Sequence, residues 1–158
     1  MELAATRRNG ASVYVDYAHT PEAIEVALKS LKPHILGKLI VIIGAGGERD
    51  EGKRPLMGLA AEKNSDFVII TDDNPRNEDP QLIHQMIKNG IKDKNKVMVI
   101  GDRAEAILKA VDLLGVGDCL LIAGKGHETE QFVGENIFPF DDFEQASLSV
   151  SSLDGIER

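Results

Sequence analysis

Short apolar runs rich in valine and isoleucine recur along the chain, separated by stretches in which apolar residues repeat with a helical period. Five such runs occupy residues 12–16, 39–43, 67–71, 97–100 and 119–123. Each run is followed by polar or glycine-containing residues, as is typical of short strands buried in a parallel sheet. The pattern therefore predicts five parallel strands at these positions.

The segments between the runs predict amphipathic helices, because apolar residues three and four positions apart share one helical face. The predicted faces are Ile24, Ala27, Leu28 and Leu31, then Leu82, Ile83, Met86 and Ile87, then Ala104, Ile107, Leu108 and Val111. Residues with helix-capping chemistry mark the starts of these helices. They are Thr20 before Pro21, Asp79 before Pro80, and Asp102 with Glu105 three residues later.

The two ends of the chain are expected to add further elements. Residues 1–6 read as a strand that turns back through Arg8, Asn9 and Gly10, since Asn-Gly favours a tight hairpin turn. The phenylalanine-containing stretch from residue 131 predicts a last strand and a short helix. Residues 147–158 are expected to form a frayed, serine-rich tail.

The alternation of strands and helices predicts a single α/β domain over residues 1–146. We expect a doubly wound, mostly parallel, Rossmann-like sheet with helices on both faces. Ligands in such folds bind at the carboxyl ends of the strands. Polar and glycine residues gather at those ends, in segments 16–21, 44–50, 72–76, 101–103 and 124–128. Residues placed for solubility alone would be shared between both ends, so the pattern predicts a binding site at this edge.

Charge and composition narrow the function classes. The chain of 158 residues has 18 basic and 26 acidic residues and a net charge of −8, which repels nucleic acid phosphates and anionic lipid. The longest apolar run, residues 39–43, is too short to cross a bilayer, and the first residues lack a signal-peptide pattern. We expect a cytoplasmic protein that binds neither nucleic acid nor membrane. Cys119 lies within an apolar run and is expected to be a buried thiol, and no metal site is expected.

Residues 47–53 have the G-x-x-x-x-G-K spacing of a phosphate-binding loop. However, Arg54 stands where a hydroxyl should meet magnesium, and Glu48, Asp50 and Glu51 would repel phosphates. Residues 44–49 begin like a dinucleotide fingerprint but end in arginine. The sequence therefore predicts no complete nucleotide-hydrolysing centre, whereas the mixed charges suit a zwitterionic ligand.

Four segments, in order, resemble the C-terminal domain of the Mur ligases: DYAHTPEA at 16–23, GERDEGKRPLMG at 47–58, DDNPR at 72–76 and AGKGHE at 123–128. Within that family, the segments most resemble the branch that adds the third residue of the peptidoglycan stem peptide. It implies an ATP-dependent acid–amino-acid ligase, in which ATP and Mg²⁺ convert a carboxylate to an acyl phosphate that the incoming amine attacks.

The resemblance also implies that the ATPase domain and the UDP-sugar domain lie outside this chain. ATP, Mg²⁺ and UDP-N-acetylmuramoyl-L-alanyl-D-glutamate would then be bound through those domains. None of them is expected to bind stably to this domain alone, and the catalytic centre would be incomplete. The isolated domain is accordingly expected to be inactive.

The resemblance implies an amino-acid site made of Arg49, Asp73, Asn74, Pro75, Arg76, Gly124 and Glu128. A guanidinium can hold the distal carboxylate of meso-2,6-diaminopimelate in a bidentate manner, while Asp73 or Glu128 accepts hydrogen bonds from an ammonium. Lysine lacks that carboxylate, and sites built on such polar matches can reject the unpaired analogue by roughly 10⁴-fold. We therefore expect a preference for diaminopimelate over lysine.

Other polar residues near the strand ends have weaker assignments. Asp16 and His19 match a family segment that lies against ATP, although Asp16 could merely end a strand and His19 could shape the Thr20 cap. Lys125 could neutralise a carboxylate or phosphate, and His127 could either orient its loop or touch the ligand. His34 and His84 have no partner pattern and are expected at the surface.

Three other functions fit part of the pattern. One is a lysine-adding Mur ligase, and another is a folylpolyglutamate synthetase, which has a similar domain plan but lacks the DNPR loop. A more remote one is a receiver-type signalling domain, in which Asp73 and Lys125 would take the usual acidic and lysine positions. Magnesium would be short of oxygen ligands in that case, and fold analogy alone does not carry function.

Overall fold

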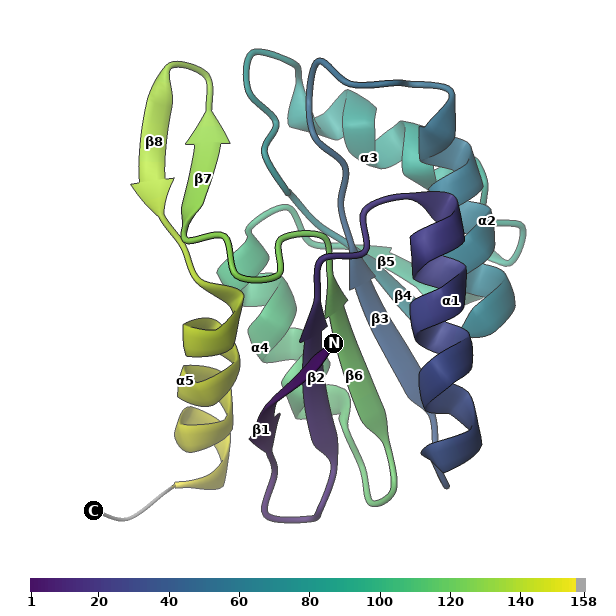
Figure 1. Cartoon of the computed structure of the whole chain (residues 1–158), viewed down its shortest axis with the longest axis vertical. Helices are drawn as coiled ribbons and strands as arrows, with labels where there is room; N and C mark the ends of the chain where they lie inside the picture. The colour runs from purple at the N-terminus through teal and green to yellow at the C-terminus, as the bar shows by residue number, and fades with distance from the viewer. Residues whose placement is uncertain (156–158) are drawn as a thin grey trace.

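A six-stranded sheet with the strand order β1-β2-β6-β3-β4-β5 runs through the computed structural model, which describes residues 1–155 (Figure 1). Neighbouring strands are parallel except β1, which pairs with β2 in the antiparallel direction through the expected turn at residues 7–11. The predicted strands and the predicted fold class are confirmed. The strands are β1 (Glu2–Thr6), β2 (Ser12–Asp16), β3 (Leu39–Ile43), β4 (Phe67–Ile70), β5 (Val97–Val99) and β6 (Cys119–Ala123).

Helices cover both faces of the sheet (Figure 1). Successive side chains of a strand point to opposite faces. Val41 and Ile43 of β3 accordingly pack with helices α1 (Pro21–Leu31), α2 (Lys53–Asn64) and α3 (Pro80–Lys88). Ile40 and Ile42 pack on the other face with α4 (Arg103–Leu113) and α5 (Asp142–Asp154). Short 3₁₀ turns occupy Lys32–His34 and Lys94–Lys96, and strands β7 (Glu130–Val133) and β8 (Asn136–Pro139) form a separate hairpin.

The sequence signals at the helix starts are confirmed, and two predicted helix faces are only partly right: in α4, Leu108 is 41% exposed, and Ala106 and Ala110 complete the buried face instead. The side chains of Thr20, Asp79 and Asp102 each accept a backbone hydrogen bond from the first turn of the following helix. In α3, however, Leu82 is 57% exposed, whereas His84 is 8% exposed and lies on the buried side. The expectation of a surface His84 is wrong, because the buried face of this helix consists of Ile83, His84 and Ile87.

The C-terminal segment is more ordered than the sequence indicated. Helix α5 continues through residues 147–154, where we expected a frayed tail, and it ends at Gly155 in a left-handed cap with φ 61°. Ser149 and Val150 are buried on the α5 side that faces the sheet and α4, so this part of the helix belongs to the core. The remaining residues of the expected tail, 156–158, lie outside the described residues.

The topology brings the carboxyl ends of four strands together. Strands β3, β4 and β5 follow one another to one side, whereas β6 inserts between β3 and β2. Open α/β sheets bind ligands at the carboxyl ends next to such a reversal in strand order.

Within residues 1–155, no helix has the length and apolar character that crossing a membrane would require.

Candidate amino-acid site

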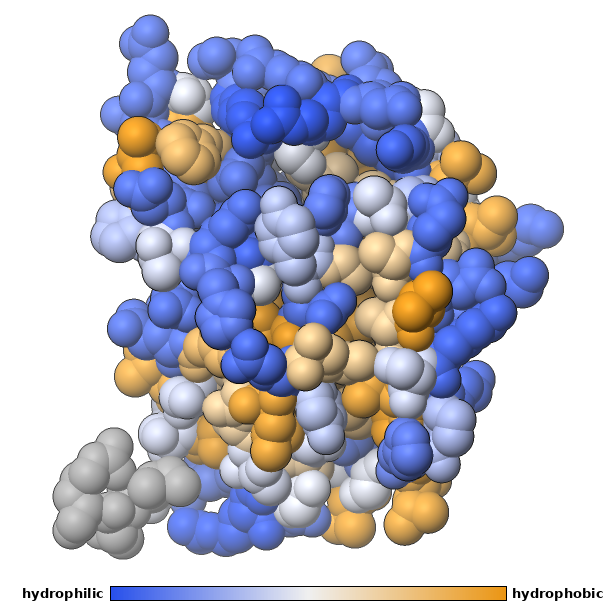
Figure 2. All heavy atoms as spheres, viewed as in Figure 1, coloured by the Kyte–Doolittle hydropathy of each residue, from blue (hydrophilic) through white to orange (hydrophobic). Residues whose placement is uncertain are grey.

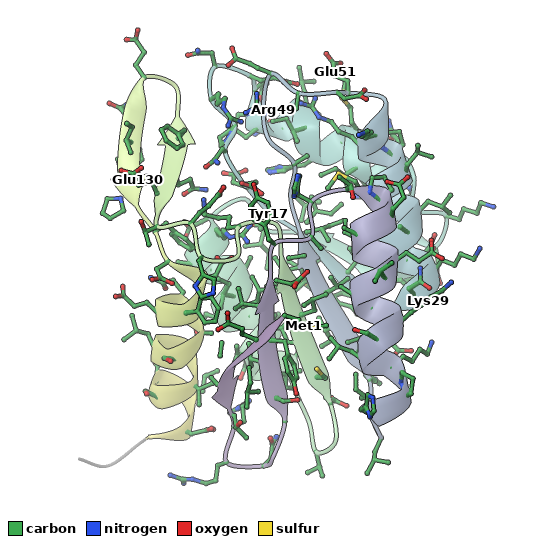
Figure 3. The ribbon with its side chains drawn as sticks, in the orientation of Figure 1. Met1, Tyr17, Lys29, Arg49, Glu51 and Glu130 are labelled. Carbon is green, nitrogen blue, oxygen red and sulfur yellow. The ribbon has the colours of Figure 1, made fainter. Side chains whose placement is uncertain are left out.

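A cavity of about 320 Å³ opens where β2, β3, β4 and β6 end. It is lined by Tyr17, His19 and Thr20 after β2, by eight of the residues between Gly44 and Met57 after β3, by Asp73, Asn74 and Arg76 after β4, and by Gly124 and Glu128 after β6. Figure 2 shows hydrophilic side chains gathered at this end of the molecule, and Figure 3 shows Arg49 and Tyr17 on the loops that extend beyond the strands. Six of the seven residues predicted for an amino-acid site therefore surround one space.

Hydrogen bonds of its main chain hold Arg76 in place. Its φ angle is 54°, a left-handed conformation that is uncommon for a residue other than glycine. The Arg76 amide donates to the carbonyl of Phe132 at 3.0 Å, and the Arg76 carbonyl accepts from the amide of Gly134 at 2.5 Å. The β7–β8 hairpin therefore fixes the main chain from which the Arg76 side chain enters the cavity.

Two glycines let the arginine-bearing loops approach each other. A Cβ atom on Gly46 would lie 2.9 Å from Arg76 Nη1 and 3.3 Å from Arg49 Cγ. Both arginine side chains therefore pass close to the Gly46 backbone, where a larger residue would leave too little space. A Cβ atom on Gly47 would lie 1.8 Å from the carbonyl oxygen of Pro75. Pro75 thus does not line the cavity as expected; its carbonyl packs against Gly47 and brings the two loops into contact.

Asp73 and Asn74 are each 7% exposed and differ in what their side chains do. The Asn74 amide oxygen accepts from the amide of Phe132 at 3.0 Å, and thus Asn74 ties the loop to the β7–β8 hairpin. The Asp73 carboxylate lies beside Gly124, where a Cβ atom would stand 2.8 Å from Asp73 Oδ2. Gly124, with φ 116°, therefore leaves room for an acidic group on the cavity wall.

Lys125, His127 and Asp16 do not line this cavity. The Lys125 side chain is fully buried, and its ammonium donates to the Glu130 carbonyl at 2.6 Å and lies 3.6 Å from a Glu128 carboxylate oxygen. These contacts tie Lys125 to its own loop, and its expected pairing with a ligand carboxylate or phosphate stays a prediction. His127 stacks on Phe143 with 4.7 Å between ring centroids. Asp16 lies in the neighbouring hollow with these two rings, and His19 alone of the ATP-assisting pair faces the main cavity.

An ion pair that no sequence motif indicated borders the cavity. Arg54, only 1% exposed, donates two hydrogen bonds to Glu78, at 2.5 and 2.9 Å. The hydrogen bonds from Arg54 and from the backbone amide of Glu48 lower the pKa of Glu78 from 4.5 to about 2. Arg54 appeared in the sequence only as a defect in a phosphate-loop motif; its partner is 24 residues further along the chain.

Two other pairings also link strand ends to helices. His84 Nε2 lies 2.6 Å from Asp72 Oδ1, which joins helix α3 to the segment after β4. Arg103 and Asp142 form a buried pair between the starts of α4 and α5. Segment 101–103, expected at the ligand edge, contributes to this framework and to an adjacent groove rather than to the main cavity.

The loop after β3 does not offer a phosphate cradle. Three of its amides are already used: those of Gly47, Glu48 and Gly52 donate to Asn74, Glu78 and Asp50, respectively. A phosphate-binding loop needs such amides free to point at its ligand. The residues present therefore do not fit ATP at this motif. No cluster of three or more potential metal-ligating His, Cys, Asp or Glu side chains occurs within residues 1–155.

Comparisons with known proteins converge on one family. The family model described as "Mur ligase, glutamate ligase domain" matches residues 1–126. A UDP-N-acetylmuramoyl-L-alanyl-D-glutamate–2,6-diaminopimelate ligase from Bradyrhizobium diazoefficiens is 52% identical over 145 residues, which cover 92% of this chain and 29% of that protein. A solved structure with the same ligase name superimposes with a TM-score of 0.91 at 40% identity, covering 97% of this chain and 31% of the other.

A folylpolyglutamate synthase from Thermotoga maritima superimposes with a TM-score of 0.56 at 24% identity, covering 78% of this chain and 26% of that one. This likeness shows a shared fold. The chain spans less than a third of the length of the curated relatives it matches.

Proposed function

This chain belongs to the Mur ligase family, and from that membership we propose that it is the amino-acid-binding domain of a ligase that adds meso-2,6-diaminopimelate to UDP-N-acetylmuramoyl-L-alanyl-D-glutamate in peptidoglycan synthesis. The proposed domain extends through the end of α5, beyond the expected boundary at residue 146. A cytoplasmic location is part of the proposal, because the reaction needs ATP and a UDP-linked substrate in one compartment.

The observation that carries the proposal is the charge pattern of the cavity at the strand ends. Arg49 and Arg76 converge over Gly46, whereas Asp73 and Glu128 lie on the wall formed by the β4 and β6 loops. Diaminopimelate has two carboxylates and two ammonium groups. A site with separate basic and acidic sides can pair both kinds of group, and guanidinium–carboxylate pairs are frequently bidentate.

The roles of individual residues follow from this arrangement. We assign the distal carboxylate to Arg76 with help from Arg49, and the nearby ammonium to Asp73 or Glu128. Asn74, Pro75 and Gly124 shape the wall through the contacts described above. Lysine would leave the arginines without a carboxylate partner, so the site should discriminate strongly against it.

The chemistry that activates the acceptor carboxylate is assigned to parts of the protein outside this chain. ATP and Mg²⁺ would supply an activated acyl group there. His19 lies on the cavity rim, where its exposed ring could reach a phosphate oxygen when those parts approach. This domain's own task is to bind the amino acid and to present its amine.

A side-by-side titration tests the proposal. We expect the protein to bind meso-diaminopimelate at least 100-fold more tightly than lysine, because one charged group of the site stays unpaired with lysine. Isothermal calorimetry of the 158-residue chain and amino-acid-dependent ligation by the full-length enzyme give two independent readouts. Equal use of both amino acids by the full-length enzyme would contradict the assignment.

A further inference from the structure

We propose that Glu78, acting through Arg54, is a positioning residue that holds Arg49 and Arg76 at the spacing needed to bind one carboxylate. The inference rests on the proposed function, because it assigns a cause to the geometry of that site. Neither Glu78 nor the Arg54–Glu78 pair was anticipated from the sequence motifs.

The Glu78 carboxylate joins segments that follow two different strands. Its Oε2 atom accepts from Arg54 Nη1 at 2.5 Å, and its Oε1 atom accepts from Arg54 Nη2 at 2.9 Å and from the Glu48 amide at 3.0 Å. Glu78 itself lies two residues after Arg76, and its amide donates to the carbonyl of Pro75 at 3.1 Å. One side chain therefore connects the loop after β4 with the loop after β3 and the first turn of α2.

Arg54 makes the second half of this link. Its Nη2 atom also donates to the carbonyl of Gly46 at 3.0 Å, so the loop after β3 is held on both sides of Gly47. Gly47 in turn donates to the Asn74 carbonyl at 2.7 Å and accepts from Arg76 Nη1 at 3.2 Å. The Arg54 guanidinium is nearly fully buried, so water cannot substitute for these bonds at low cost.

The pair holds Glu48 in an unusual backbone conformation through the bond from the Glu48 amide to the Glu78 carboxylate. Among the described residues, Glu48 and Arg76 are the two non-glycine residues with positive φ, at 59° and 54°. Such conformations are energetically unfavourable and persist where the surroundings over-determine them. Arg49 follows Glu48 directly, so the direction in which its side chain leaves the loop depends on this strained residue.

Removal of the Glu78 charge should therefore release both arginines together. Arg54 would keep a buried charge without its partner, and the Glu48 backbone could relax to a negative φ. Misplacement of binding groups by about 1 Å can cost on the order of 10²-fold in an enzyme site. Binding should weaken most for a ligand that contacts both arginines, which in the proposed function is diaminopimelate.

The test uses steady-state kinetics of the full-length ligase that contains this domain. We expect Glu78→Gln to raise the KM for meso-diaminopimelate at least tenfold and to reduce the preference over lysine, with the KM for ATP unchanged within twofold. Glu62→Gln is the matched control, because Glu62 also accepts two backbone amide bonds, at 3.0 and 2.8 Å, but joins α2 to the loop before β5. That control should leave the KM for diaminopimelate, the KM for ATP and the preference over lysine unchanged.

Two further variants separate positioning from folding. Arg54→Lys keeps the positive charge but cannot form the two-pronged pair, so it should reproduce the Glu78→Gln kinetics; Glu78→Asp should give a partial loss. Both are assayed below their melting temperatures. The inference would be overturned if Glu78→Gln and Arg54→Lys left the KM for diaminopimelate unchanged, or if they raised the KM values for diaminopimelate, lysine and ATP equally. A wild-type enzyme that ligates no diaminopimelate would instead overturn the proposed function.

Discussion

Arg103 and Asp142 form an ion pair in which both side chains are fully excluded from solvent, with Arg103 Nε and Nη2 donating to the two carboxylate oxygens at 2.8 and 2.7 Å. Arg103 also donates to the carbonyls of Asp72 and Ala123, each at 3.1 Å. A single guanidinium therefore connects helix α5 to the ends of β4 and β6, next to Asp73 and Gly124.

Asp142→Asn should destabilise the protein strongly. Breaking a buried pair leaves an uncompensated charge and typically costs about 3–5 kcal/mol. Urea unfolding should show a loss of this size in the free energy of unfolding. Glu144→Gln, an exposed change on the first turn of the same helix, should stay within about 0.5 kcal/mol. A stable Asp142→Asn protein would mean that α5 is not anchored through this pair.

Arg76→Ala should lower the preference for diaminopimelate over lysine by about 10²-fold or more, because the distal carboxylate loses its bidentate partner. Competition binding to the full-length enzyme measures the ratio directly. Lys29→Ala, at an exposed position of α1, serves as the control for a lost surface cation. A preference unchanged by Arg76→Ala would show that the assignment of this arginine is wrong.

Gly47→Ala should disrupt the contact between the two arginine-bearing loops. The new methyl group would stand 1.8 Å from the Pro75 carbonyl oxygen, so one loop must move. We expect a loss of about 2 kcal/mol or more in unfolding free energy, together with weaker diaminopimelate binding. Gly52→Ala tests the same loop with a much milder contact, since Gly52 has φ −62° and the nearest neighbour, an Asp50 carboxylate oxygen, would be 3.3 Å away and can shift. That variant should be neutral or slightly stabilised.

Glu78 should make folding stability sensitive to acid. Its pKa is about 2 in the folded protein, below the ordinary value of 4.5, because the ionised form accepts hydrogen bonds from Arg54. A depressed pKa contributes stability above the unfolded value, and this stability is lost as the pH falls from about 4.5 through 2. The contribution should be about 1–2 kcal/mol, allowing for partial solvent screening. Chemical unfolding of wild type and Glu78→Gln at pH 7 and pH 3 measures it: their difference should shrink at pH 3.

The 158-residue chain should hydrolyse no ATP. Three of the amides that a phosphate loop would use, those of Gly47, Glu48 and Gly52, already donate to Asn74, Glu78 and Asp50. A phosphate-release assay on the purified chain, with the full-length ligase as the positive control, checks this expectation. Detectable ATP turnover by the purified chain would contradict the assignment of the ATPase centre to other parts of the full-length protein.

The sequence predicts the fold well because its determinants are local. Apolar runs define the strands, and single residues such as Thr20, Asp79 and Asp102 cap the helices through bonds to their own first turns. The ligand edge also follows from the sequence, since parallel strands place their carboxyl ends side by side. Six of the seven residues expected around an amino acid line the same cavity for this reason.

What the sequence hides are pairings between distant residues. Arg54 and Glu78 are 24 residues apart, and Arg103 and Asp142 are 39 apart, so no local spacing connects them. A charged residue beside an apolar helix face looks like a solvent-exposed one until its partner is known. The same problem misplaced His84, which is buried against Asp72, and it hid the bond from the Lys125 ammonium to the Glu130 carbonyl.

The β7–β8 hairpin offers a route by which the proposed choice of amino acid could change over evolutionary time. The hairpin grips both the amide and the carbonyl of Arg76, yet it stands outside the six-stranded sheet. A longer or shorter turn at residues 134–135 would move Arg76 through these two main-chain bonds and leave both hydrophobic layers intact. Selectivity can thus drift through the length of a surface turn, without any replacement among the residues that touch the ligand.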